Sequence, residues 1–194
     1  MQELSMKEQS LPPILFQTFF VSRERSSSPQ IEEIIGFCKK LGEAKLLEEG
    51  KGSVSIGYGN RMLITGEDAL LSSLSSDDIV EVVDVDPIKN IVLAAGKRAP
   101  SKQTPVHWLI QRARHDVHVV VFLPNKKITE YNISDLPVTE CMAPSGTIDL
   151  AKEVLKALRN GKTIIVKDTG LLLVGLTLHE IETTTNDFKK RIVK

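Results

Sequence analysis

One run of apolar residues limits most strongly what this chain can fold into. Residues 117–123 are Val-His-Val-Val-Val-Phe-Leu, an almost unbroken series of branched and aromatic side chains. A strand with one face in water alternates apolar and polar residues, whereas a strand covered on both faces does not. We therefore expect 117–123 to be a central strand, with helices packed against both faces of its sheet.

Helices are expected where apolar residues recur every three or four positions behind a capping residue. Ser28, followed by Pro29, and Thr147 are caps of this kind, and Thr104 precedes a third apolar stripe. The pair Thr177 and Glu180 has the reciprocal capping pattern that opens a helix. Four helices are therefore predicted, starting near residues 29, 105, 148 and 178.

Strands are expected where β-branched residues cluster between turn residues. Gly59-Asn60 predicts a two-residue hairpin between strands at 53–58 and 61–65. Further strands are predicted at 79–85, 91–95, 163–167 and 171–175. Together with the helices, these strands predict a three-layer α/β/α fold, in which helices cover both faces of a mixed or antiparallel sheet.

The chain is long enough for one domain with a full hydrophobic core. The Ser-rich segment 26–29 predicts a boundary between an N-terminal arm, residues 1–28, and a single domain, residues 29–194. The apolar stretch 11–21 in the arm is too short to span a bilayer and is broken by Pro12 and Pro13. It fits either an extra strand or an arm at an interface between chains.

The charge balance and the cysteines limit the partners and the compartment. The 25 basic residues offset the 25 acidic residues, so no bulk field draws the chain to nucleic acid or to an anionic membrane. Neither partner is expected. Cys38 and Cys141 stand far apart, without another Cys or His at metal-binding spacing. Reduced thiols in a cytoplasmic protein are therefore expected, rather than a disulfide.

Four segments, in order, resemble the class II aldolase/adducin family, whose fold is that of L-fuculose-phosphate aldolase. Residues 51–65 resemble its G-N-I-S and L-I-T-P-S-G motifs, and residues 100–107 resemble P-S-S-E-x-P-x-H. Residues 114–121 resemble the segment before its H-x-H pair, and 164–175 resemble L-L-x-N-H-G-L-x-x-x-G. The resemblance covers roughly residues 31–182. It implies the same three-layer fold and a homo-oligomer.

The resemblance also implies a zinc ion held by three histidines, with a glutamate acting as acid and base. Those ligand positions carry Phe122, Pro124 and Thr169 here, and the glutamate position carries Gln103. Phenylalanine and proline offer no side-chain donor to a metal, and a glutamine amide does not exchange a proton near neutral pH. We therefore expect no zinc cofactor, and no catalytic residue is assigned. The four histidines elsewhere in the chain are expected to be unrelated to metal.

Members of this family bind substrate phosphate through glycine turns and hydroxyl groups. The resemblance implies ligand binding at Gly52, Ser53, Thr65, Ser101, Lys102 and Gln103. Among these residues, Lys102 adds a cation, and the helix that follows offers free backbone amides to an anion. Glu67 and Asp68 would oppose the same anion. Gln103 fits two roles, a hydrogen bond to a ligand or a hydrogen bond within its own loop.

Three functions stay open at this point. The first is a diverged, non-catalytic family member that binds a small anionic or phosphorylated metabolite, or a protein partner. The second is a metal-dependent aldolase or epimerase of sugar phosphates with a rebuilt site, which would be a carbon–carbon lyase or an epimerase. The third is an assembly module. A pocket lined by Gly52, Ser101 and Lys102 favours the first, bound metal the second, and a flat apolar surface the third.

Overall fold

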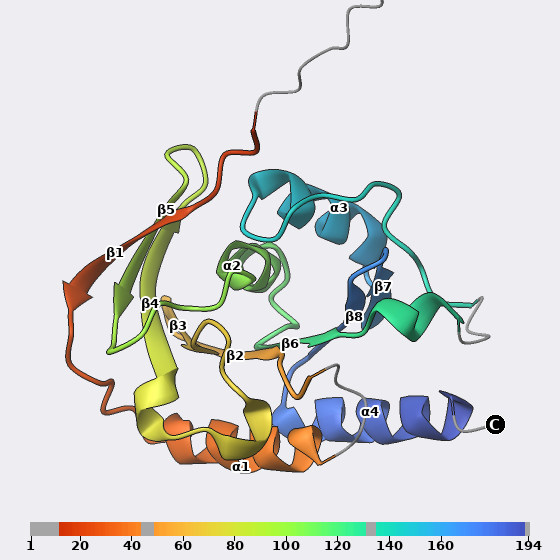
Figure 1. Cartoon of the computed structure of the whole chain (residues 1–194), viewed down its shortest axis with the longest axis horizontal. Helices are drawn as coiled ribbons and strands as arrows, with labels where there is room; N and C mark the ends of the chain where they lie inside the picture. The colour runs from red at the N-terminus through yellow and green to blue at the C-terminus, as the bar shows by residue number, and fades with distance from the viewer. Residues whose placement is uncertain (1–11, 44–48, 131–134, 193–194) are drawn as a thin grey trace, which may run out of the picture.

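The computed structural model describes residues 12–43, 49–130 and 135–192, and over these residues a sheet of eight strands lies between two pairs of helices (Figure 1). The strands are β1 (Gln17–Ser22), β2 (Ser53–Tyr58), β3 (Arg61–Thr65), β4 (Ile79–Asp86), β5 (Ile91–Ala95), β6 (Val119–Pro124), β7 (Thr163–Val166) and β8 (Gly170–Gly175). The helices are α1 (Gln30–Gly42), α2 (Thr104–Ala113), α3 (Ile148–Leu158) and α4 (Leu178–Ile192). Short 3-10 helices, which the sequence did not predict, span Leu71–Ser73, Ser76–Asp78 and Lys126–Glu130.

The strand order is β1-β5-β4-β3-β2-β6-β8-β7. Strands β1 and β5 are parallel, and the other neighbouring strands are antiparallel. The predicted central strand, β6, lies between β2 and β8, and the predicted hairpin joins β2 to β3. The predicted three-layer α/β/α fold with a mixed sheet is therefore confirmed.

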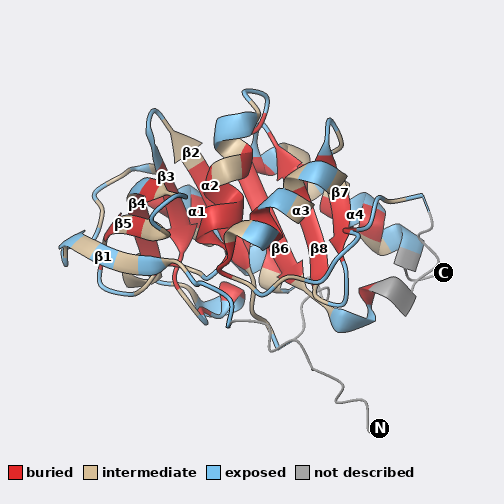
Figure 2. Cartoon of the chain, turned by 90° about the horizontal axis from the view of Figure 1, so that it is seen from above, coloured by how far each residue is buried: buried red, intermediate tan, exposed pale blue. Residues whose placement is uncertain are grey.

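The packing explains why the β6 segment is apolar throughout. Val119, Val121 and Leu123 belong to the core cluster that includes residues of α1 and α4. Val120 and Phe122 point the other way, into the cluster that includes residues of α2 and α3. The helices cover opposite faces of the sheet in Figure 1, and the strands between them are buried in Figure 2. Full burial of each such side chain contributes about 1.5–3 kcal/mol.

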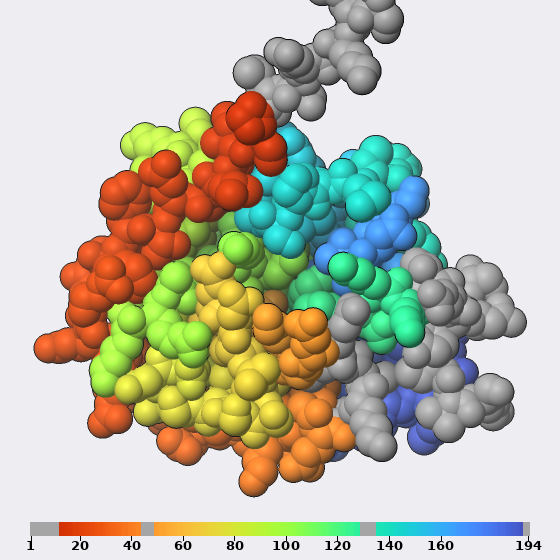
Figure 3. All heavy atoms as spheres, viewed as in Figure 1, coloured from red at the N-terminus to blue at the C-terminus, as the bar shows by residue number. Residues whose placement is uncertain are grey.

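The N-terminal arm supplies the edge strand of the sheet. Gln17 pairs with Ile91 and Phe20 with Ala94, so residues 17–22 extend the sheet beyond β5. The Phe16 amide also donates to the Gly146 carbonyl at 3.0 Å, and the arm lies along the edge of the molecule in Figure 3. Of the two roles left open for 11–21, the structure shows the extra strand over residues 17–21.

Of the predicted caps Ser28, Thr104 and Thr147, only Thr147 is the N-cap residue of its helix. Thr147 accepts a hydrogen bond from the Leu150 amide at 3.2 Å, as predicted. Ser28 accepts from the Gln30 amide at 3.4 Å, but it lies one residue before the N-cap of α1, which is Pro29. Thr104, by contrast, is the first residue of α2 and not its cap.

The hydroxyl of Thr104 donates back to the Ser101 carbonyl at 2.6 Å. The backbone amide of Gln103, just before this helix, donates to the Ser101 hydroxyl at 3.2 Å. Serine and threonine hydroxyls compete for such local bonds, and the loop geometry decides which one accepts. The N-cap residue of α2 is Gln103, so the cap prediction was one residue too late.

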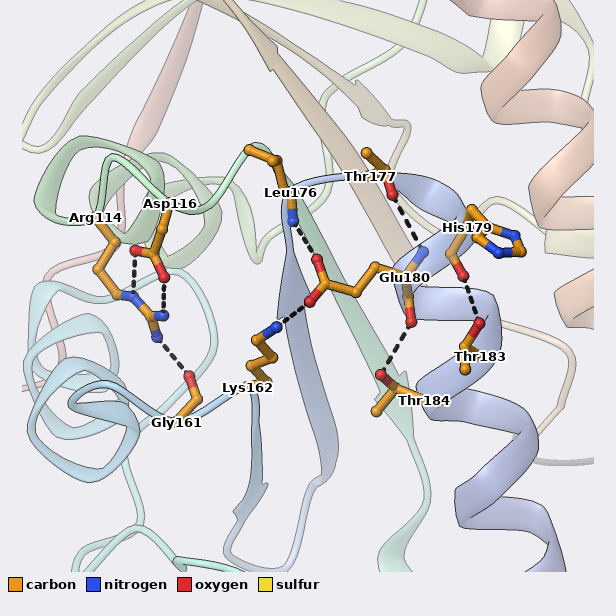
Figure 4. A network of polar contacts seen from close by, with 10 residues as sticks. All are labelled: Arg114, Asp116, Gly161, Lys162, Leu176, Thr177, His179, Glu180, Thr183 and Thr184. Atoms are coloured by element: carbon orange, nitrogen blue, oxygen red, sulfur yellow. Dashed lines mark hydrogen bonds and ion pairs between the residues drawn. The ribbon is translucent and has the colours of Figure 1, made fainter.

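The last helix begins with a modified capping pattern, shown in Figure 4. The Glu180 amide donates to the Thr177 hydroxyl at 3.2 Å, as predicted. The Glu180 carboxylate accepts instead from the Leu176 amide, at 2.8 Å, and pairs with Lys162. The Lys162 bond, followed by the backbone bond, lowers the pKa of the Glu180 carboxyl. This carboxylate therefore ties α4 to the strand that starts after Lys162.

Candidate functional site

A pocket of about 260 Å³ opens where the start of β2, the loop before α2 and the end of β6 meet. Five of the six predicted ligand-binding residues line it, namely Gly52, Ser53, Ser101, Lys102 and Gln103. The remaining one, Thr65, is buried beside the pocket wall. Its hydroxyl accepts from the Val54 amide at 3.2 Å, and its carbonyl accepts from the Ser101 amide at 3.1 Å. Thr65 therefore supports the wall rather than forming it.

The strand register brings distant parts of the chain into this pocket. Ser53 on β2 lies opposite Phe122 on β6, and Pro124 lies opposite Gly170 on β8. The Asn125 amide also donates to the Thr169 carbonyl at 3.0 Å. The pairing is close enough that only glycine fits at position 170. Phe122, Pro124 and Thr169 consequently share one pocket with Gln103.

The charged residues at the pocket rim are balanced. The Lys102 ammonium lies 2.8 Å from a Glu67 carboxylate oxygen, and this hydrogen bond raises the pKa of Lys102. Lys51, a pocket residue that the sequence did not predict, lies 3.6 Å from Asp68. The side chain of Lys102 is 64% exposed, so its ion pair is worth at most about 1 kcal/mol and opens easily.

A buried hydrogen-bond network stands behind Ser53. The His107 ring lies 2.9 Å from the Ser53 hydroxyl through Nε2 and 2.8 Å from the Ser55 hydroxyl through Nδ1. Gln111 donates to the same Ser55 hydroxyl at 3.2 Å. Burial lowers the pKa of His107 to about 3, so the imidazole is neutral at physiological pH. This arrangement fixes the Ser53 hydroxyl at the pocket wall.

Sequence reasoning did not find this network, although its parts are visible in the sequence. Ser53 and Ser55 point to the same side of β2 because they are two residues apart, and His107 lies on a buried helix face. Ser145 was also missed. It lines the pocket from the loop before α3 and accepts a hydrogen bond from the side-chain amide of Gln103 at 3.0 Å. Gln103 thus lines the pocket and also bonds within the protein.

The donor set of this pocket does not fit a zinc ion. Phe122 and Pro124 present no lone pair, and the Thr169 hydroxyl donates to the Lys167 carbonyl at 2.9 Å. Structural and catalytic zinc sites use thiolate, imidazole and carboxylate ligands. Among the described residues, no group of three or more such side chains is placed to hold a metal.

The histidines outside the buried network lie elsewhere. His115 and His118 line a different pocket, and His179 lies exposed in the first turn of α4. Cys38 is buried and Cys141 is exposed, and both are free thiols. Trp108 packs in the core cluster that includes residues of β4 and β5. Within the described segments, each helix is too short or too polar to cross a bilayer.

Comparisons with known proteins agree with this architecture. The family model for the class II aldolase and adducin N-terminal domain matches residues 32–186. An L-fuculose phosphate aldolase from Methanocaldococcus jannaschii is 27% identical over 166 residues, covering 76% of this chain and 84% of the relative. A 5-methylthioribulose-1-phosphate/5-deoxyribulose-1-phosphate aldolase from Escherichia coli is 27% identical over 165 residues, covering 77% of this chain and 75% of the relative.

Solved structures share the fold at lower sequence identity. The sugar-phosphate aldolase from Thermotoga maritima superposes with a TM-score of 0.68 at 14% identity, covering 84% of this chain and 91% of that one. The four segments that resemble the family lie inside the matched region, and so do all the residues that line the candidate pocket. The chain therefore belongs to the class II aldolase and adducin N-terminal domain family.

Proposed function

We propose that this protein is a diverged class II aldolase-fold member that binds a small phosphorylated metabolite without zinc-dependent aldol chemistry. The observation that carries the proposal is the pocket itself. It gathers Gly52, Ser53, Ser101 and Lys102, while its three family ligand positions hold side chains that do not bind zinc. The relatives from M. jannaschii and E. coli carry the names of sugar-phosphate aldolases, which supports a ligand of this class.

The balanced rim favours a phosphorylated polyol over a simple anion. Lys102 offers a cation to a phosphate group, and the Ser101 hydroxyl offers a further donor. Glu67 accepts hydrogen bonds, so it matches the hydroxyl groups of a sugar and not the phosphate. A ligand with both kinds of group uses both halves of the ion pair. A bare anion gains from Lys102 but is opposed by Glu67 and Asp68.

The neutral imidazole of His107 supports binding and not acid–base chemistry. Because Nε2 bonds to the Ser53 hydroxyl, the hydroxyl keeps one orientation at the pocket wall. Gln103 cannot replace the family glutamate, since an amide neither accepts nor releases a proton near neutral pH. The hydroxyl and amide groups of this site position a ligand, and its two carboxylates, Glu67 and Asp68, lie in ion pairs with Lys102 and Lys51.

The proposal is tested by calorimetric titration with L-fuculose 1-phosphate in the presence of a chelator. We expect binding without added metal, weakened about tenfold or more by Lys102→Gln, which removes the ammonium group next to Ser101. The matched control is Lys152→Gln. That lysine is 69% exposed on α3, against 64% for Lys102, and its pair with Asp149 is long, at 3.7 Å. Binding unaffected by Lys102→Gln would contradict the proposal.

The rival function is a metal-dependent aldolase or epimerase with a rebuilt site, and the names of the relatives favour it. It predicts cleavage or epimerisation of a sugar phosphate that requires a divalent cation. Turnover that disappears in Gln103→Ala would establish it and remove the non-catalytic proposal.

Homo-oligomerisation, a protein partner and a cytoplasmic location are further proposals. Sedimentation of the purified chain as a single monomer would remove the first of these.

A further inference from the structure

A second pocket, of about 400 Å³, lies at the opposite end of β2 and α2 from the first one. It lies between the β2–β3 hairpin, the last turn of α2 and the segment that enters β6. The residues that line it include Gln30, Tyr58, Arg61, Arg112, His115 and His118. Of the residues that the structure describes in its wall, none is acidic. Its volume suits a small metabolite.

Two contacts hold the side chain of Arg112 in place at this pocket. Its guanidinium lies over the ring of Trp108, 4.2 Å from the centroid, and donates to the Asn60 carbonyl at 2.6 Å. Within the described part of the chain, no carboxylate lies in ion-pair range of it. A guanidinium carries five N–H donors in a planar fork, and most of them are left for another acceptor. This geometry suits the oxygens of a phosphoryl group.

Two carboxylates that contact neighbouring residues, Glu81 and Asp116, pair with other arginines. Glu81 pairs with Arg61 at 2.5 Å and accepts from the Ser26 hydroxyl at 2.6 Å. Asp116 faces Arg114, with bonds of 3.1 and 2.5 Å, and Figure 4 shows this pair turned toward Gly161. Arg61 is therefore neutralised by its partner, whereas the charge of Arg112 is not offset.

The floor of this pocket is polar and depends on a glycine. A Cβ atom at residue 57 would lie 2.9 Å from the Gln111 side-chain oxygen, so glycine at this position allows Gln111 to pack here. Gln111 in turn donates to the His118 carbonyl at 2.8 Å, which fixes the segment that carries His115 and His118. Both histidines are exposed and line the pocket.

We infer that this second pocket is an anion-binding site, and that it takes the phosphoryl group of a small metabolite. Its charge differs from that of the first pocket, where Glu67 and Asp68 offset Lys102 and Lys51. Arg112 supplies the fork, His115 and His118 supply further donors, and Tyr58 and Gln30 border the remaining volume. The site is separate from the one that carries the proposed function.

The test uses inorganic phosphate as the probe and Trp108 fluorescence as the readout. Trp108 is the only tryptophan of the chain, and it lies directly under Arg112. A saturable change in fluorescence is expected on titration with phosphate, compared with chloride at equal ionic strength. Arg112→Gln should weaken the apparent binding about tenfold or more. Lys102→Gln, in the first pocket, should leave it unchanged.

Because Arg112 also packs on Trp108, a second variant separates binding from packing. His115→Ala changes an exposed residue that takes no part in the stacking of Arg112 on Trp108, and it should weaken phosphate binding several-fold. A phosphate response that is absent, or unchanged in both variants, overturns the inference. A response lost only in Lys102→Gln also overturns it and assigns phosphate to the first pocket, which supports the proposed function.

Discussion

Gly170→Ala is expected to lower the free energy of unfolding by about 3 kcal/mol or more. The added methyl group would lie well inside contact distance of the Leu123 carbonyl oxygen, 2.9 Å from the Pro124 Cα and 3.0 Å from the Asn125 amide. These are backbone atoms of β6 and its end, so they cannot rotate away as a flexible side chain would. Equilibrium denaturation by urea measures the effect.

Gly36→Ala is the matched control, because it makes the same chemical change where there is space. No heavy atom lies within 4 Å of the position of the new Cβ, and residue 36 is exposed within α1. Alanine is favoured over glycine inside a helix, so this variant should gain about 1 kcal/mol. A Gly170→Ala protein within about 0.5 kcal/mol of the parent would contradict the described β6–β8 contact. It would also remove the basis for placing Thr169 in the pocket.

The buried imidazole of His107 should make folding stability depend on pH. Burial lowers its pKa from an ordinary value of 6.5 to about 3, so the unfolded chain binds a proton more readily than the folded protein. The stabilisation is therefore fully present above pH 6.5 and is lost progressively as the pH falls toward 3. Between pH 7 and pH 5 this group alone should remove about 2 kcal/mol of stability.

His107→Gln should abolish that component, because glutamine does not titrate. At pH 7 the variant should be less stable by about 1–3 kcal/mol, since the Ser53 and Ser55 hydroxyls lose well-placed partners. The difference between parent and variant should then shrink as the pH falls to 5. His115→Gln, at an exposed position, serves as the control and should keep the parent pH dependence. A constant difference between parent and His107→Gln would show that His107 does not titrate with folding.

The sequence predicted the parts of the fold that depend on local pattern. The apolar run ending at Leu123 identified the central strand, and Gly59-Asn60 identified the hairpin, because burial and turn chemistry act over a few residues. The motif resemblance predicted the family, which the comparisons confirm. It also predicted ligand binding at Ser53, Ser101 and Lys102, which line one pocket in the structure.

Features made by long-range pairing were not predictable in the same way. The parallel pairing of β1 with β5 joins segments more than 60 residues apart, and no local pattern specifies its direction. The ion pair between Glu67 and Lys102 depends on how two loops approach. The second pocket combines α1, the β2–β3 hairpin and the end of α2, so its excess of cations becomes visible only after folding.

We propose that the pocket of this chain does not coordinate zinc, and elemental analysis of the purified protein measures this. The purified chain is equilibrated with excess zinc, treated with a mild chelator and desalted. A variant that combines Phe122→His, Pro124→His and Thr169→His is the positive control, since the three positions share the pocket wall. We expect the variant to retain zinc and the parent chain to retain no stoichiometric amount. About one zinc per parent chain, held through chelation, would contradict the account.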